Sequence, residues 1–102
     1  MKGIREKIVE KLLENLHDKA ISKVQEDEKT FYDEVEIKGI LASVKYHIDY
    51  FESPYIEIED VTVASEDKYF DSIASYVSYR LEDELEVINK ELTQSVKHQY
   101  AY

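Results

Sequence analysis

The chain has 102 residues, of which 43% are apolar and 35% charged, and a formal net charge of −10; this composition predicts one folded domain and not a disordered chain. The absence of cysteine excludes disulfides, thiol catalysis and thiolate metal sites. No apolar run reaches the roughly 18 residues that cross a membrane, and we expect a cytoplasmic protein.

The negative charge is concentrated after the first quarter of the chain. Residues 1–29 carry seven acidic and seven basic side chains, whereas residues 30–102 carry sixteen acidic and six basic ones. Residues 49–86 hold twelve acids against Lys68 and Arg80. Nucleic acids and anionic membranes are bound through Lys and Arg side chains that displace counterions. We therefore predict no direct binding to nucleic acid or membrane.

The N-terminal part has the pattern of an amphipathic helix. Apolar residues recur every three or four positions from Ile4 to Val24, which is the spacing of one helix face. Lys19 and Lys23 lie near the C-terminal end, where positive charge suits the helix dipole. The sequence predicts a helix over residues 2–28.

A long β-hairpin is predicted over residues 31–64. Residues 30–50 alternate between apolar and polar side chains, and so do residues 55–64 after a turn that holds the only proline. The alternation changes phase near Gly39 and again after Asp60, which predicts a bulge or sharp twist midway. The expected register places Ile48 opposite Ile58 and Tyr50 opposite Ile56.

The C-terminal part has the most regular periodicity of the chain. Apolar residues recur from Phe70 to Val96 at helical spacing, and Ser65 is a suitable capping residue before two acids. We predict a helix over residues 66–97 and a frayed tail at 98–102. The fold class is α+β: one domain of residues 1–102, ordered α-β-β-α, in which two long helices cover one face of a bent hairpin. A homodimer that pairs two hairpins would also remove their exposed edges.

No motif indicates catalysis or a cofactor. The chain has no phosphate-binding glycine loop and no nucleophile motif, and its three histidines are far apart in sequence. We therefore expect neither an enzyme nor a cofactor or metal protein. The acids of the hairpin could hold a divalent cation, but alternation at Glu57 and Glu59 is also that of a solvated strand face. The second interpretation is favoured.

Tyrosine is abundant, with nine residues. Tyr46 lies in sequence near other aromatics at the turn end of the hairpin, and a further stripe lies on the C-terminal helix. Such rings either cover the margin of a thin core or anchor a partner, because tyrosine and arginine are enriched at binding hot spots. The candidate partner-binding residues are Asp49, Tyr50, Phe51, Glu52, Tyr55, Glu57, Glu59, Asp60, Tyr69, Tyr76, Tyr79 and Arg80.

Two short motifs mark the strands of the hairpin: residues 35–39 read Val-Glu-Ile-Lys-Gly and residues 56–61 read Ile-Glu-Ile-Glu-Asp-Val. These motifs resemble the V-E-V-x-G and E-I-E-x-V strands of small acidic proteins encoded by bacteriophages and mobile elements. The long charged N-terminal helix departs from their pattern. The resemblance implies a phage origin and carries over no functional residue.

Small acidic phage proteins often block host defence by imitating nucleic-acid charge or occupying a basic groove. The leading hypothesis is therefore a non-enzymatic inhibitor, of the anti-CRISPR or nucleic-acid-mimic kind, that binds a basic nucleic-acid-handling protein in the host cytoplasm. Electrostatic steering by the net charge of −10 agrees with it. The alternative is a homo-oligomeric structural or virion-associated protein whose tyrosines form a self-interface.

Overall fold

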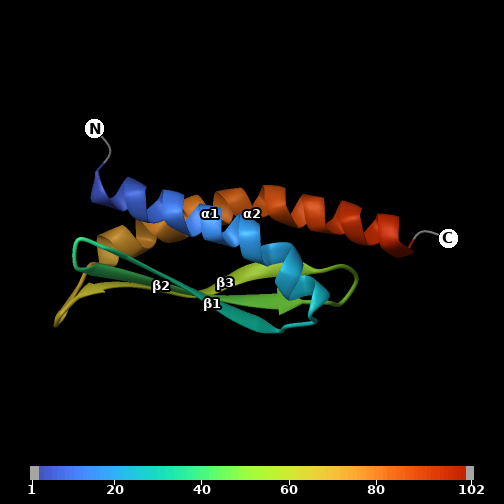
Figure 1. Ribbon diagram of the computed structural model, residues 1–102, viewed down its shortest axis with the longest axis horizontal. Coiled ribbons are helices and arrows are strands. Elements are labelled where there is room, and N and C mark those ends of the chain that lie inside the picture. The colour runs from blue at the N-terminus through green and yellow to red at the C-terminus, as the bar shows by residue number, and fades with distance from the viewer. Residues whose placement is uncertain (1–2, 101–102) are drawn as a thin grey trace.

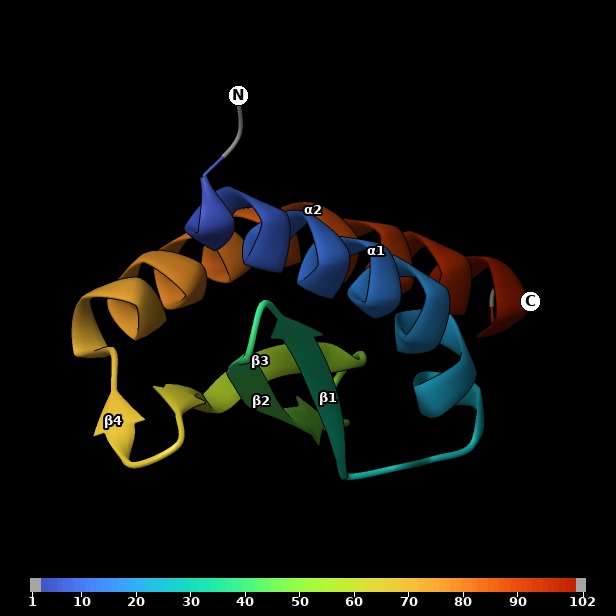
Figure 2. The same cartoon turned by 60° about the vertical axis from the view of Figure 1, so that its left-hand side comes forward.

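Two helices cover one face of a four-stranded antiparallel sheet (Figure 1). The computed structural model describes the backbone of residues 3–100 and the side chains of residues 3–94. The helices lie side by side and run in the same direction (Figures 1 and 2). The predicted α+β class and the covering of one face are confirmed. The elements are α1 (Ile4–Gln25), β1 (Thr30–Ile37), β2 (Ile40–Asp49), β3 (Tyr55–Ser65), β4 (Lys68–Tyr69) and α2 (Asp71–Tyr100), with the strands adjacent in the order β1-β2-β3-β4.

Residues 30–50 form two strands where the sequence pattern predicted one. Lys38 and Gly39 both have positive φ, 50° and 80°, as in the type I′ turn that joins two strands through two residues. Ile37 and Ile40 face each other across the turn. The phase change near Gly39 is therefore a tight hairpin turn, and the sheet contains β1 in addition to the two predicted strands.

The turn gives two substitutions with opposite expected effects on stability. Gly39→Ala places a side chain at a φ of 80° and should lower the free energy of unfolding by about 1 kcal/mol. Lys38→Asn creates the Asn-Gly pair preferred in type I′ turns and should raise it by about 0.5 kcal/mol. Urea denaturation of both variants measures the difference. A loss of stability in both would contradict this turn geometry.

The predicted bulge is present midway along the β2–β3 pair. Lys45 faces Asp60 and Tyr46 faces Ile58, so Glu59 is the additional residue on β3. The predicted register was wrong by two residues, because Ile48 faces Ile56 and not Ile58. The loop is longer than expected: the Asp49 carboxylate accepts a hydrogen bond from the Phe51 backbone N–H at 3.0 Å, and this turn ends β2 before Tyr50.

α1 ends at Gln25, before the predicted residue 28, in a Schellman motif. Asp27 adopts a left-handed φ of 57°, its N–H donates to the Val24 carbonyl at 3.1 Å, and the Glu28 N–H donates to the Lys23 carbonyl at 3.1 Å. These bonds use carbonyls that have no partner within the helix. The chain then enters β1 at Thr30.

The predicted helix start at Ser65-Glu66-Asp67 is instead a turn between β3 and β4. Glu66 has a φ of 51°, so the chain reverses there, and the Phe70 N–H donates to the Val63 carbonyl at 2.8 Å. α2 begins only at Asp71 and continues as helix to Tyr100, beyond the predicted end at residue 97. Of the tail expected to fray, residues 98–100 are helical and residues 101–102 lie outside the described residues.

The core lies between the helices and the inner face of the sheet. It receives alternate residues of β1, β2 and β3 and the apolar stripes of α1 and α2. Tyr46 is completely buried in it, stacked on Phe31 with ring centroids 4.7 Å apart. The sequence had placed Tyr46 among aromatics at the turn end of the hairpin, but its even-numbered position on β2 points inward. Its hydroxyl has no hydrogen-bond partner among the described residues.

Burial, together with the charge of Asp33, raises the pKa of Tyr46 well above its ordinary value of 10.0. In the unfolded chain the phenol ionises near pH 10, whereas in the folded protein it remains protonated. The contribution of Tyr46 to the free energy of unfolding is therefore fully present below pH 10. It falls as the pH rises above 10, by up to about 1.4 kcal/mol per pH unit.

Tyr46→Phe should remove this part of the pH dependence. Between pH 8 and pH 11 the variant should gain about 1.4 kcal/mol relative to the wild type, measured by urea denaturation at each pH. Tyr79→Phe is the matched control, because the Tyr79 ring is exposed. If wild type and Tyr46→Phe lost stability equally between pH 8 and pH 11, the pH dependence could not be assigned to Tyr46.

Candidate functional site

The side of the sheet opposite the helices is open to solvent over β1, β2 and β3 (Figure 2). Its side chains include the even-numbered residues of β1, the odd-numbered residues of β2, Tyr55 and Glu57 of β3 and, because of the bulge, both Glu59 and Asp60 of β3. We call this surface the open face. Its charged and aromatic residues are Tyr32, Glu34, Glu36, Lys45, His47, Asp49, Tyr55, Glu57, Glu59 and Asp60.

The open face is strongly acidic. It carries six carboxylates and one lysine. The Lys45 ammonium lies 3.3 Å from the Glu59 carboxylate and 5.8 Å from the Tyr32 ring centroid. The hydrogen bond and charge of Glu59 raise the pKa of Lys45. The single cation is thus already paired, and the other acids of the face dominate its potential.

The structure brings five of the predicted partner-binding residues together on the open face: Asp49, Tyr55, Glu57, Glu59 and Asp60. Phe51 and Glu52 lie in the loop at its end, and Phe51 is 90% exposed. Tyr50 is half-buried, and its hydroxyl donates to the Glu28 carbonyl at 2.5 Å. Burial, aided by Asp27 and Glu28, raises the pKa of Tyr50. Tyr50 therefore links the loop to the segment that follows α1.

The other four predicted residues lie away from the open face. Tyr76 and Arg80 join the two helices: one Arg80 guanidinium nitrogen donates to both Glu6 carboxylate oxygens, at 2.8 and 3.0 Å, and to the Tyr76 hydroxyl at 2.6 Å. The Arg5 guanidinium lies over the Tyr76 ring, 4.5 Å from its centroid. Tyr76 and Arg80 thus have an internal role. Tyr69 on β4 and Tyr79 on α2 are exposed.

Sequence reasoning missed the contribution of β1 to this surface. Tyr32, Glu34 and Glu36 are exposed, and their alternation with Phe31, Val35 and Ile37 is visible in the sequence. The alternation over residues 30–50 predicts one continuous strand, so the sequence pattern does not align these residues with β2. The two positive-φ turn residues are the signal that assigns β1 to the sheet.

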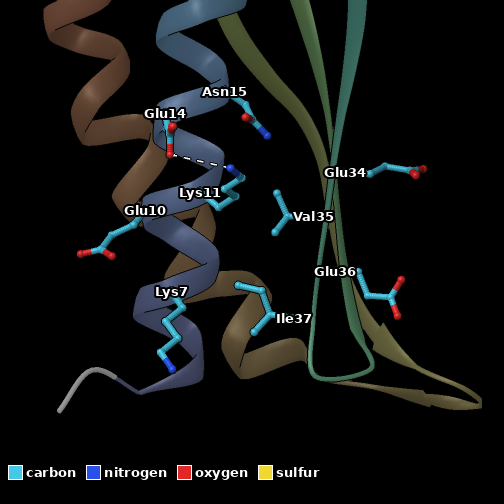
Figure 3. A pocket seen from close by; sticks show the side chains of 9 residues that line it. All are labelled: Lys7, Glu10, Lys11, Glu14, Asn15, Glu34, Val35, Glu36 and Ile37. Atoms are coloured by element: carbon cyan, nitrogen blue, oxygen red, sulfur yellow. Dashed lines mark ion pairs between the residues drawn. The ribbon is translucent and has the colours of Figure 1, made fainter.

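Two grooves lie between the helices and the strands, one next to β1 and the other next to the start of β3. One, of about 420 Å³, lies between α1 and β1 (Figure 3). The other, of about 600 Å³, lies between Tyr55 and the second half of α2, with Asn89 and Thr93 among its lining residues.

The described residues form neither a cluster of metal ligands nor a membrane-spanning helix. Among them no three histidine, aspartate or glutamate side chains converge as metal ligands. No described helix combines the length and the low polarity that crossing a bilayer requires. The acids of the open face are spread over three strands, an arrangement that suits contact with an extended basic surface.

No family model, curated protein sequence or solved structure matches this chain.

Proposed function

We propose that the protein is a non-enzymatic acidic interaction module, encoded by a phage, whose open face binds a basic nucleic-acid-handling protein of the host and inhibits it. One observation carries this proposal: six carboxylates from three strands share one solvent-facing surface with a single, already paired lysine. A surface of one sign steers an oppositely charged partner and gives fast, salt-sensitive association. Exposed Tyr32 and Tyr55 lie among these acids as aromatic anchors.

Capture from a bacterial lysate, compared between two charge-matched variants, tests this proposal. The open-face variant carries Glu34→Gln, Glu36→Gln, Glu57→Gln and Asp60→Asn. The control variant carries Glu82→Gln, Asp83→Asn, Glu86→Gln and Glu91→Gln on α2. All eight positions are exposed, and both variants lose four negative charges.

Wild type and control should retain nucleic-acid-handling proteins at low salt, and double-stranded DNA should displace them, because both ligands use the same basic groove. The open-face variant should retain at most about a tenth as much. Equal loss from both variants would show an effect of net charge alone. Partners that DNA does not displace would contradict the nucleic-acid-handling class.

The second candidate is a homo-oligomeric structural or virion-associated protein. It is favoured by the exposure of Tyr79 on the outer side of α2 and Tyr69 on β4, since large exposed rings are typical of interfaces. Size exclusion with light scattering separates the two candidates. A monomer contradicts the second, whereas an oligomer that dissociates on Tyr79→Ala or Tyr69→Ala supports it.

A further inference from the structure

The outer edge of β1 presents unpaired backbone groups. In the antiparallel β1–β2 pair, alternate residues of β1 point their N–H and C=O toward β2. Ile48 N–H donates to the Lys29 carbonyl at 2.8 Å, so in this register the odd-numbered residues are those bonded to β2. The N–H and C=O of Tyr32, Glu34 and Glu36 therefore point outward. In the described part of the chain these groups have no hydrogen-bond partner.

The opposite edge of the sheet is covered near both ends of β3. Ile56 of β3 donates its N–H to the Asn89 side chain at 2.8 Å and accepts from the Asn89 amide at 3.1 Å. Further along, β4 pairs with Ala64 and Ser65. α2 and β4 thus take the place of a neighbouring strand at these positions of β3. No described element pairs with the outer edge of β1, so another strand can add there.

A groove runs beside this edge. Its walls are α1, with Lys7, Lys11 and Asn15, and β1 (Figure 3). Val35 and Ile37 point from β1 toward α1, whereas Glu34 and Glu36 point the other way, toward the open face (Figure 3). A strand added to β1 would therefore meet Val35 and Ile37 together with polar side chains of α1 on its groove side, and two glutamates on its other side.

We propose that the β1 edge binds, as an antiparallel fifth strand, an extended segment of the partner in which basic and apolar residues alternate. Side chains directly opposite each other on paired strands lie about 5 Å apart. Basic residues two positions apart would pair with Glu34 and Glu36, and the intervening apolar residues would contact Val35 and Ile37. The proposal rests on the proposed function and names the kind of segment that the acidic module recognises.

A second copy of the chain is disfavoured by its own charges in the two registers that pair the edge over Glu34 and Glu36. Antiparallel pairing of β1 with its copy, centred on Glu34, places Glu34 opposite Glu34. Centred on Val35, the pairing places Glu34 opposite Glu36 twice. Like charges directly opposite each other destabilise a strand pair, whereas a basic segment converts the same positions into ion pairs. Charge complementarity therefore selects a basic partner segment.

The test uses an end-capped octapeptide that alternates lysine and valine, with nitrogen-15 NMR titration of the full chain. In the proposed antiparallel pairing, the lysines lie opposite Glu34 and Glu36, so their N–H groups face β1 and the valine N–H groups face solvent. N-methylation of the lysines should thus weaken binding at least about tenfold, and N-methylation of the valines should leave it almost unchanged. A peptide of the same composition, with lysines and valines in two blocks, should also bind about tenfold more weakly.

The amide signals of Tyr32, Glu34 and Glu36 should shift on binding, and the shifts should be smaller at about 0.15 M salt. Equal affinity of the two N-methylated peptides, or shifts confined to other residues, would overturn the proposal. A dimer in light scattering whose Tyr32, Glu34 and Glu36 amides exchange slowly would overturn it also, because the occupant would then be a second copy.

The outcome is separable from that of the proposed function. If both N-methylated peptides bind equally but the open-face variant still captures fewer host proteins, the edge site is contradicted and the proposed function is supported. If the alternating peptide binds at β1 but the capture of host proteins does not depend on the open face, the edge site is supported and the proposed function is contradicted.

Discussion

Replacing Asn89 by leucine should lower the free energy of unfolding by about 3 kcal/mol. Asn89 is 6% exposed and belongs to α2, and its side-chain amide bonds both the N–H and the C=O of Ile56. Leucine has a similar volume but no polar atom, so both backbone groups of Ile56 would remain buried without a partner. Each buried unsatisfied group costs about 1–3 kcal/mol.

Asn89→Asp separates the two hydrogen bonds. A carboxylate still accepts from the Ile56 N–H but no longer donates to its carbonyl, and it introduces a buried charge. It should therefore destabilise as well. Lys90→Ala is the control, because Lys90 is the exposed neighbour on the same helix, and its effect should stay within about 0.5 kcal/mol. Urea denaturation measures all three, and an effect of Asn89→Leu as small as that of Lys90→Ala would contradict the role of Asn89.

Removing the donors to Asp33 should destabilise the protein, whereas removing Asp33 itself should not. Asp33 is 3% exposed on the inner side of β1, and one of its carboxylate oxygens accepts from Asn15 at 3.1 Å and from Lys19 at 3.2 Å. Its other oxygen has no partner among the described residues. Asn15→Ala with Lys19→Met leaves a buried carboxylate alone and should cost about 3 kcal/mol.

Asp33→Val should stay within about 1 kcal/mol of the wild type or exceed it, because hydrophobic residues often replace a buried ion pair without loss. Valine suits this position, since Phe31 and Val35 lie on the same face of β1. In the Asp33→Val background, the double substitution at Asn15 and Lys19 should lose most of its effect. Thermal and urea unfolding of the four proteins close this cycle. Equal losses of the free energy of unfolding in Asp33→Val and in the double variant would contradict this prediction.

The sequence predicts the exposed residues correctly where strand alternation alone determines which side chains face solvent. Glu57 and Glu59 were assigned to a solvated strand face, and both are exposed on the open face. Tyr76 and Arg80 lie on the same stripe of α2 as exposed Tyr79, so the sequence predicts that they too are binding anchors. In the structure α1 packs beside that stripe, and the Glu6 carboxylate accepts hydrogen bonds from the Arg80 guanidinium. Helical spacing identifies which residues share a stripe and contains no information on which stripe a second helix covers.

Asp33 and Asn89 were also overlooked, although the sequence contains a signal for each. Asp33 stands at an apolar position of the β1 alternation, and Asn89 stands beside Ile88 in the apolar stripe of α2. A polar residue inside an apolar pattern indicates a buried partner. The sequence does not identify that partner. Only the packing of the helices on the sheet brings Asn15 close to Asp33, and Ile56 close to Asn89.

By itself the sequence determined the class, the two helices, which residues share a face of each strand and the bulge, because each follows from local periodicity. It also determined that the acids gather after residue 30. The tertiary structure decided the turn at Lys38-Gly39, the two-residue shift in register, the short β4 and the uncovered edge of β1. These depend on backbone conformations and pairings between distant residues, and a period of two or 3.6 is the same for every register and every partner.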